Sequence, residues 1–407
     1  MNSYAPPPVV DVDASPFSAT STTDRMRTAR VFLAALAPML TVASIRGLVI
    51  DSHRCGPAAL HAFVALGMLG AAIGAPLLAA RADRTGTHAR LAVALPVVDA
   101  LVTLASAHTT STALLFALRP IHGIASMGLL ALLFGDLRRT SQRFVARAGT
   151  SMIAALAIGP ALGGVLTKFG ATAAFDVAAT VSVLMAALLA RRPMESVVAP
   201  RAETSTTRRS VFDAAARLHA PLALLAIQRA AIGGFIAVFA VRARAAGVPD
   251  SRIGASFSLF LVAFAVAVAL VGRGGERRLR TELIPLGGVL FTAGFLFLAA
   301  FTGARALPFL ILAGAGAGMV YAPCLGVAAH GAGSRGHATT MAMVHAAGAV
   351  GMVIGPLAAA LVDIAFCGMS PSGRGAVFLV VAGGFQALAC LALHNDCRDL
   401  TVDRKSP

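Results

Sequence analysis

The chain has 407 residues, of which 57% are hydrophobic and only 13% are charged, and its formal net charge is +16. Soluble domains carry about 25% charged residues, so this composition excludes an ordinary soluble enzyme. The apolar residues must instead be grouped along the chain, because a helix needs a run of roughly 20 of them to cross a bilayer.

Twelve apolar runs are predicted, six before and six after a polar segment at 191–217. The first six occupy 31–50, 57–80, 91–107, 111–134, 148–167 and 171–190. The second six occupy 218–241, 253–272, 283–301, 306–329, 338–362 and 375–394. The runs are continuous rather than alternating, which excludes a β-barrel. The sequence therefore predicts an all-α membrane protein with twelve transmembrane helices in two pseudo-symmetric six-helix bundles.

These runs place the bundles at 30–192 and 218–394, with a cytoplasmic linker at 193–217 and tails at 1–29 and 395–407. The amino-terminal tail lacks the basic start and apolar core of a signal peptide, so we expect a disordered segment. Pro residues inside the runs are expected to kink the helices rather than end them, since neighbouring helices satisfy the freed backbone groups.

The distribution of basic residues predicts the orientation. With a cytoplasmic amino terminus, cytoplasmic segments hold 24 of the 34 Lys and Arg residues, external loops hold seven and the spans hold three. This asymmetry is what the positive-inside rule expects, so both termini are predicted to be cytoplasmic. The positive charge then needs no nucleic-acid partner. Abundant Ala and Arg with scarce Lys suggest a GC-rich bacterial genome, and hence the bacterial cytoplasmic (inner) membrane.

Two short sequences recur at nearly one offset. Ile158-Gly159-Pro160 is matched by Ile354-Gly355-Pro356, and Asp83-Arg84 stands opposite Glu276-Arg277. The shifts are 196 and 193 residues, which favours two parallel repeats over twelve unrelated spans.

Twelve spans in two halves, with a basic loop after the second span, resemble the major facilitator superfamily over residues 30–394. The family's loop motif runs Gly-x-x-x-Asp-Arg-x-Gly-Arg-Arg. Asp83, Arg84 and Gly86 match it, whereas Ala79 replaces the first Gly and Thr87-His88 replace the basic pair. The resemblance implies that Asp83, Arg84 and Gly86, together with Asp136 on the same side, form a gating network. The alternative is a solvated surface pair worth about 0–1 kcal/mol.

Two further motifs lie inside the spans. Arg119-Pro120-Ile121-His122-Gly123 resembles the family's Arg-x-x-x-Gly motif. Gly159, Pro160, Gly163 and Gly164 match the Gly-Pro-x-x-Gly-Gly motif of the drug:proton antiporter branch. That resemblance implies an exporter, although small residues also serve simply to pack helices closely.

Charged groups inside the spans are candidates for the transport pathway, because such groups are costly in a membrane. Arg46, Arg119 and Arg229 lie in the first, fourth and seventh spans. The resemblance places the first, fourth, seventh and tenth spans around a central cavity. It therefore implies that the three arginines bind substrate together with Gln228 and Tyr321, although Tyr321 also suits plain packing.

The deepest acid is Asp99, at the same predicted depth as Arg119 on the next helix. The two are predicted to form a buried ion pair. That pair is either structural or a proton-coupling site, in which Arg119 biases the protonation of Asp99. His122 and His345 are further proton-coupling candidates, because His titrates near neutral pH, although a His in a packed helix is more often a hydrogen-bonded core residue.

Surplus positive charge in the cavity favours an anionic solute and repels cations. We therefore expect a proton-coupled exporter of a small anionic or amphipathic molecule, such as a siderophore-type metabolite or a drug, working by alternating access. The alternatives are an organic-anion importer or exchanger and a receptor without transport. The expected partners are the solute and the lipid bilayer, and the protein is expected to act as a monomer.

An enzyme is not expected, because the sequence shows no nucleophile–base pairing and no phosphate-binding Gly loop. The five cysteines have neither the spacing of a metal site nor a predicted disulfide. We therefore expect no metal and no cofactor, with the proton gradient as the energy source.

Overall fold

The computed structural model describes residues 22–137, 142–192, 218–272, 281–331 and 333–402, which are almost entirely helical. The first half contains α1 (Thr22–Thr41), α2 (Pro57–Thr85), α3 (His88–His108), α4 (Thr112–Leu137), α5 (Gln142–Leu166) and α6 (Ala173–Arg191). The second half contains α8 (His219–Ala245), α9 (Asp250–Gly272), α10 (Leu283–Ala300), α11 (Leu307–Gly331), α12 (Gly333–Ala365) and α13 (Pro371–Val402). Short helical turns occupy Gly47–Ser52 (η1), Thr167–Phe169 (η2) and Gly303–Ala306 (η3).

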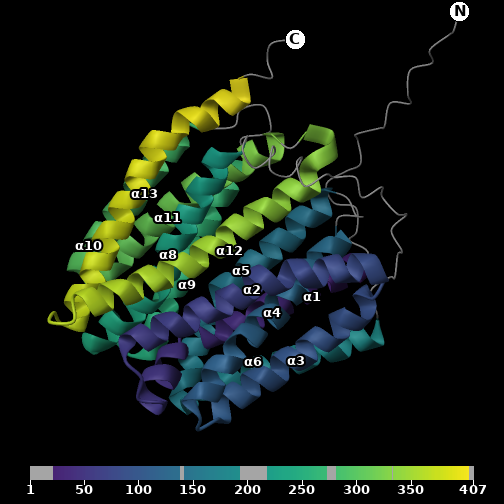
Figure 1. The fold of residues 1–407 in the computed structure, drawn as a ribbon, viewed down its shortest axis with the longest axis horizontal. Helices are drawn as coiled ribbons and strands as arrows, with labels where there is room; N and C mark the ends of the chain where they lie inside the picture. The colour runs from purple at the N-terminus through teal and green to yellow at the C-terminus, as the bar shows by residue number, and fades with distance from the viewer. Residues whose placement is uncertain (1–21, 138–141, 193–217, 273–280, 332, 403–407) are drawn as a thin grey trace, which may run out of the picture.

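The helices form two groups that lie side by side, α1–α6 and α8–α13 (Figure 1). In the described part of the chain, 11 helices are long and apolar enough to cross a membrane. Large apolar side chains such as Leu77, Leu101, Leu361 and Leu388 are more than 60% exposed, as expected for residues that face lipid. The predicted fold of two membrane-spanning six-helix halves is confirmed.

The first span is the exception to the predicted continuous runs, because α1 stops at Thr41. A turn at 42–44 follows, and the chain then coils into the π-helix η1. Pro38 precedes the break by one turn, and its carbonyl accepts a hydrogen bond from Thr41 Oγ1 at 2.9 Å. A broken helix is tolerated at membrane depth only where protein surrounds it, and Thr41 and Ser44 are indeed buried.

Several helices extend beyond the apolar runs that predicted them. α1 already begins at Thr22, inside the predicted tail, and α13 continues to Val402, beyond the predicted end at residue 394. Hydropathy identifies the part of a helix that is apolar, whereas polar turns outside it continue the same helix. Residues 1–21 and the linker at 193–217 lie outside the described residues.

The two halves use glycine at equivalent positions. Gly159 and Gly163 bring α5 against the backbone of α1, and a side chain at Gly163 would collide with the carbonyl of Leu40. In the second half, Gly355 brings α12 against α8 in the same way, at the carbonyl of Ala230. Such small residues let membrane helices approach closely. The Ile-Gly-Pro repeat in the sequence therefore corresponds to the same kind of close helix contact in each half.

The two halves share apolar packing at one end of the bundle. We call the end where α1 begins and α13 ends the terminal end, and the opposite end the far end. Toward the terminal end, one apolar cluster belongs entirely to the first half and another entirely to the second. At the far end, Ala237 of α8 joins a cluster formed by Leu48, Phe63 and their neighbours in the first half. Across the halves, α2 packs on α12 and α5 packs on α9.

Candidate functional site

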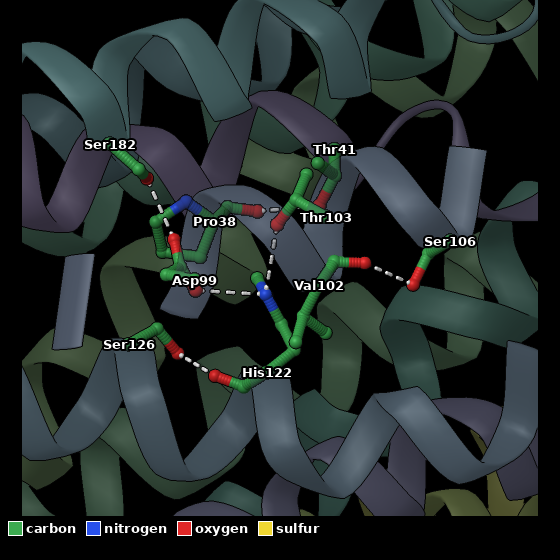
Figure 2. Close-up of polar contacts among 9 residues, drawn as sticks. All are labelled: Pro38, Thr41, Asp99, Val102, Thr103, Ser106, His122, Ser126 and Ser182. Atoms are coloured by element: carbon green, nitrogen blue, oxygen red, sulfur yellow. Dashed lines mark hydrogen bonds and ion pairs between the residues drawn. The ribbon is translucent and has the colours of Figure 1, made fainter. Parts of the chain in front are cut away.

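A buried polar cluster connects three helices of the first half (Figure 2). Asp99 on α3 receives a hydrogen bond from Ser182 Oγ of α6, with 2.7 Å to Oδ2. Its Oδ1 lies 3.0 Å from Nδ1 of His122 on α4. The same imidazole nitrogen lies 3.2 Å from Thr103 Oγ1, one turn along α3 from Asp99. All four side chains are buried, so one carboxylate ties α3, α4 and α6 together inside the membrane region.

The expected close ion pair between Asp99 and Arg119 is not formed, because His122 lies beside the carboxylate and Arg119 interacts with Asp99 only from a longer distance. The Arg119 guanidinium turns toward α2, with Cζ 4.8 Å from the centre of the Phe63 ring. Gly67 makes this possible, since a side chain there would meet Arg119 Nε. The position of the guanidinium is therefore decided by which helix leaves room for a long side chain.

Arg119 is buried without a salt bridge, although the negative charge of Asp99 attracts its guanidinium from a longer distance. Its side chain is 9% exposed, its Nε has no hydrogen-bond partner, and no carboxylate of the described residues lies within ion-pair distance of it. The Phe63 ring supplies only a cation–π contact, typically worth about 0.5–2 kcal/mol. A guanidinium in such surroundings is attractive to an anion.

Arg46 is neutralised by Asp51, an acid that lies just beyond the predicted first span. Its Nη1 lies 2.7 Å from Oδ2 of Asp51, and the Asp51 side chain is 49% exposed. In a π-helix, residues five apart are hydrogen-bonded neighbours, so the switch from α1 to η1 brings positions 46 and 51 together. Arg46 therefore forms an ion pair at the far end instead of standing as a free charge at a central site.

Arg229 and Tyr321, both predicted to bind substrate, are brought together in the second half. Arg229 Cζ lies 5.1 Å from the centre of the Tyr321 ring and 5.9 Å from that of Phe264 on α9. No carboxylate in the described ranges is within ion-pair distance of this guanidinium. Phe264 was missed, because a single Phe in an apolar span carries no signal of its own.

Gln228, next to Arg229 in the sequence, points elsewhere. It is fully buried, and its Nε2 donates a hydrogen bond to the Ala317 carbonyl of α11 at 2.7 Å. Adjacent residues on a helix point about 100° apart. The amide therefore joins α8 to α11 in this conformation, while Arg229 faces the two aromatic rings.

The antiporter-type motif lies where α5 meets both α1 and α9. Gly159 and Gly163 contact α1 at Met39 and Leu40, immediately before the break. Gly164 contacts the start of α9, and the Ala161 amide donates to Ser258 Oγ at 3.0 Å across the two halves. The motif therefore packs one half against the other beside the broken helix.

The remaining predicted residues are placed only in part. Gly86 ends α2 with a left-handed φ of 65°, which favours glycine. Asp83 and Arg84 belong to the last turn of α2 rather than to a loop, and their side chains, like that of Asp136, lie outside the described residues. His345 is exposed on α12. No three His, Cys, Asp or Glu side chains in the described part are grouped to hold a metal ion.

Two membrane-spanning halves with charged side chains buried among their helices are the arrangement expected of a solute transporter. A family model described as Major Facilitator Superfamily matches residues 28–356, and the chain belongs to this family. Comparison with curated protein sequences gives no match.

Solved structures of two transporters are similar to this chain. A mutant of the nucleoside transporter NupG has a TM-score of 0.77 at 12% identity, covering 92% of this chain and 99% of that one. A bacterial homologue of the human lysosomal transporter Spinster, in an inward-facing and occupied conformation, has a TM-score of 0.71 at 16% identity, covering 92% and 98%. At these identities the likeness shows the fold.

Proposed function

We propose that this protein is a proton-coupled exporter of a small anionic or amphipathic molecule, such as a siderophore-type metabolite or a drug. The observation that carries the proposal is the pair of membrane-embedded guanidinium groups, Arg119 and Arg229. Neither forms a salt bridge with a carboxylate of the described residues, and Asp99 attracts Arg119 only from a longer distance. Leaving such a charge unpaired is unfavourable, and an anionic solute would supply the missing partner.

The surroundings of Arg229 favour a solute that also has apolar surface. The guanidinium lies against Tyr321 and Phe264, so a ligand anion reaching it would contact aromatic rings as well. Charge-assisted hydrogen bonds from Arg to a carboxylate or phosphate are directional and often bidentate. A planar or amphipathic anion combines both kinds of contact.

The buried Asp99–His122 pair supports proton coupling. Protonating Asp99 would remove its charge and weaken its attraction to His122. Ser182 Oγ is an alternative partner for Asp99, and Thr103 Oγ1 is an alternative partner for His122. Because α1 packs on both α4 and α6, a rearrangement of this cluster would reach the broken helix. Protonation of Asp99 could therefore change the packing of α1 and so move helices of the first half.

The glycine motif of α5 supports export over import. The asymmetry of basic residues supports a cytoplasmic position for both termini. The composition supports the inner membrane of a bacterium, where we propose that the protein acts as a monomer. With that orientation the far end lies on the external side of the membrane. A conformation whose halves are joined there is therefore inward-facing. A second candidate, an organic-anion importer or exchanger, is supported by the same two arginines.

Direction is tested by labelled-anion uptake into inside-out and right-side-out membrane vesicles. The proposal predicts uptake by inside-out vesicles that depends on an acidic lumen and is abolished by a protonophore. Uptake confined to right-side-out vesicles would identify an importer, and movement of no solute would favour a receptor. Arg229→Ala should reduce uptake at least tenfold, whereas Arg305→Ala, on an exposed turn, should not.

A further inference from the structure

An ion-pair cluster joins the two halves at the far end of the bundle. His61 on α2 and Asp363 on α12 come from opposite halves, and His61 Nε2 lies 3.1 Å from Asp363 Oδ2. Arg374 on α13 approaches the other carboxylate oxygen, with 3.4 Å between Nε and Oδ1. Its Nη1 donates to the Asp363 carbonyl at 3.3 Å. We call His61, Asp363 and Arg374 the far-end cluster.

The far-end cluster is shielded from solvent. The His61 and Asp363 side chains are 2% and 12% exposed, and His61 Nδ1 is buried without a hydrogen-bond partner among the described residues. Buried charges are screened by salt much less than exposed ones. The interaction between His61 and Asp363 therefore depends strongly on whether the imidazole carries a charge.

The other charged side chains near this end of α2 either contact groups other than His61 and Asp363 or, like Arg54, are exposed. Arg46 pairs with Asp51, and Arg119 lies over the Phe63 ring. Arg242 donates to the Leu298 and Ala299 carbonyls, and Arg244 lies near Asp250. His53 contacts Thr112, and Arg54 is exposed. Asp363 is consequently the acid that faces His61, and Arg374 is the second cation on that acid.

We propose that the far-end cluster is a proton-binding site that holds the two halves together at this end. When His61 is protonated, Asp363 attracts a cation from each side, one of them on the opposite half. When His61 is neutral, the contact across the halves is reduced to a hydrogen bond from an uncharged ring. Because His changes charge near neutral pH, acid stabilises the closed far end and a higher pH favours its opening.

This inference requires only that the halves of a major facilitator protein separate at the far end during transport. It depends neither on the charge of the solute, nor on the direction of transport, nor on a role for Asp99. If the proposed export of an anion were disproved, the role of the far-end cluster would still stand. If the role of the far-end cluster were disproved, the proposed export would still stand.

Two native cysteines allow the opening to be measured directly. Cys55 precedes α2 and Cys367 follows α12, so they lie at the far end on opposite halves, and neither is buried. Cys324, Cys390 and Cys397 are fully buried. Spin labels on Cys55 and Cys367 of the full chain in lipid nanodiscs would therefore report the separation of the halves by pulsed electron resonance.

We expect the long-distance population of the wild type to grow several-fold between about pH 5.5 and about pH 8, the range in which His titrates. His61→Gln keeps an amide donor but cannot titrate, and should abolish this pH dependence. His108→Gln is the matched control. His108 also pairs with an acid at the far end, at 2.8 Å from Asp176, but both residues belong to the first half. That variant should respond like the wild type.

Asp363→Asn should increase the long-distance population at every pH. Resistance of the three buried cysteines to a maleimide serves as the folding check for each variant. The proposal is overturned if the wild-type distances do not change with pH, or if folded His61→Gln keeps the full response.

Discussion

Asp99 Oδ1 and His122 Nδ1 lie 3.0 Å apart between α3 and α4, and Ser182 holds the other oxygen of the same carboxylate. Three helices of the first half therefore share one ionisable group. The fourth neighbour, α1, is broken beside Pro38 and packs on α4 and α6. In the proposed proton coupling, Asp99 would be the group that changes charge and α1 the neighbouring helix that responds.

Asp99→Asn should separate exchange from coupling. The amide keeps the size of the carboxylate but cannot release a proton, so we expect solute exchange to continue while gradient-driven accumulation is lost. Proteoliposomes with and without an imposed pH gradient measure the two activities. Asp176→Asn, at an exposed His–Asp pair, is the control. Accumulation by Asp99→Asn at the wild-type level would contradict the assignment.

His122→Ala should destabilise the protein markedly. Removing one partner of a buried ion pair leaves an uncompensated charge, which typically costs about 3–5 kcal/mol. His108→Ala removes the partner of an exposed pair, in which the His side chain is 56% exposed, and should change the stability by less than about 1 kcal/mol. Denaturant unfolding of both variants gives the comparison, and equal effects would contradict the difference in burial.

Arg46→Ala should leave solute affinity nearly unchanged, whereas Arg229→Ala should weaken it at least tenfold. Arg46 already has Asp51 as a partner, and an ion pair this exposed contributes about 0–1 kcal/mol. Titration of a bound anion against the two purified variants measures the contrast. A large loss with Arg46→Ala would show that this arginine reaches the solute despite its pairing.

Gly163→Val should destabilise the protein by about 1–3 kcal/mol through overpacking, because the new side chain would meet the Leu40 carbonyl of α1. Gly149→Ala on the same helix is the matched control. Nothing lies within 4 Å of a side chain there, and Ala is the better helix former. Thermal unfolding in detergent compares them. A Gly163→Val variant as stable as the wild type would refute the close approach of α5 to α1.

The division into two halves was predictable because a bilayer demands long apolar helices, and those are visible in composition alone. The break in the first span was not, since Pro38 resembles the other Pro residues that helices tolerate. The partner of Asp99 was mispredicted because depth alone does not determine which way a side chain points. Packing decided this, through the space that Gly67 leaves for Arg119.

Contacts between the halves could not be predicted from the sequence. His61 and Asp363 are separated by 302 residues, and no motif spacing connects them. The contact between Arg229 and Tyr321 agrees with the family resemblance, which implies that both of their spans line a central cavity. Phe264 lies on a different span, so its contribution becomes visible only when α9 is packed against α8 and α11.

Anion recognition by the unpaired arginines is tested most directly by ligand-induced thermal stabilisation of the purified protein. A ligand that binds the folded state raises the unfolding temperature according to its affinity. A panel of matched anionic, neutral and cationic compounds should raise it only for anions, and the Arg119→Ala/Arg229→Ala double variant should lose that response while remaining folded. Stabilisation by cations instead, or an unchanged response to anions in the double variant, would contradict the account.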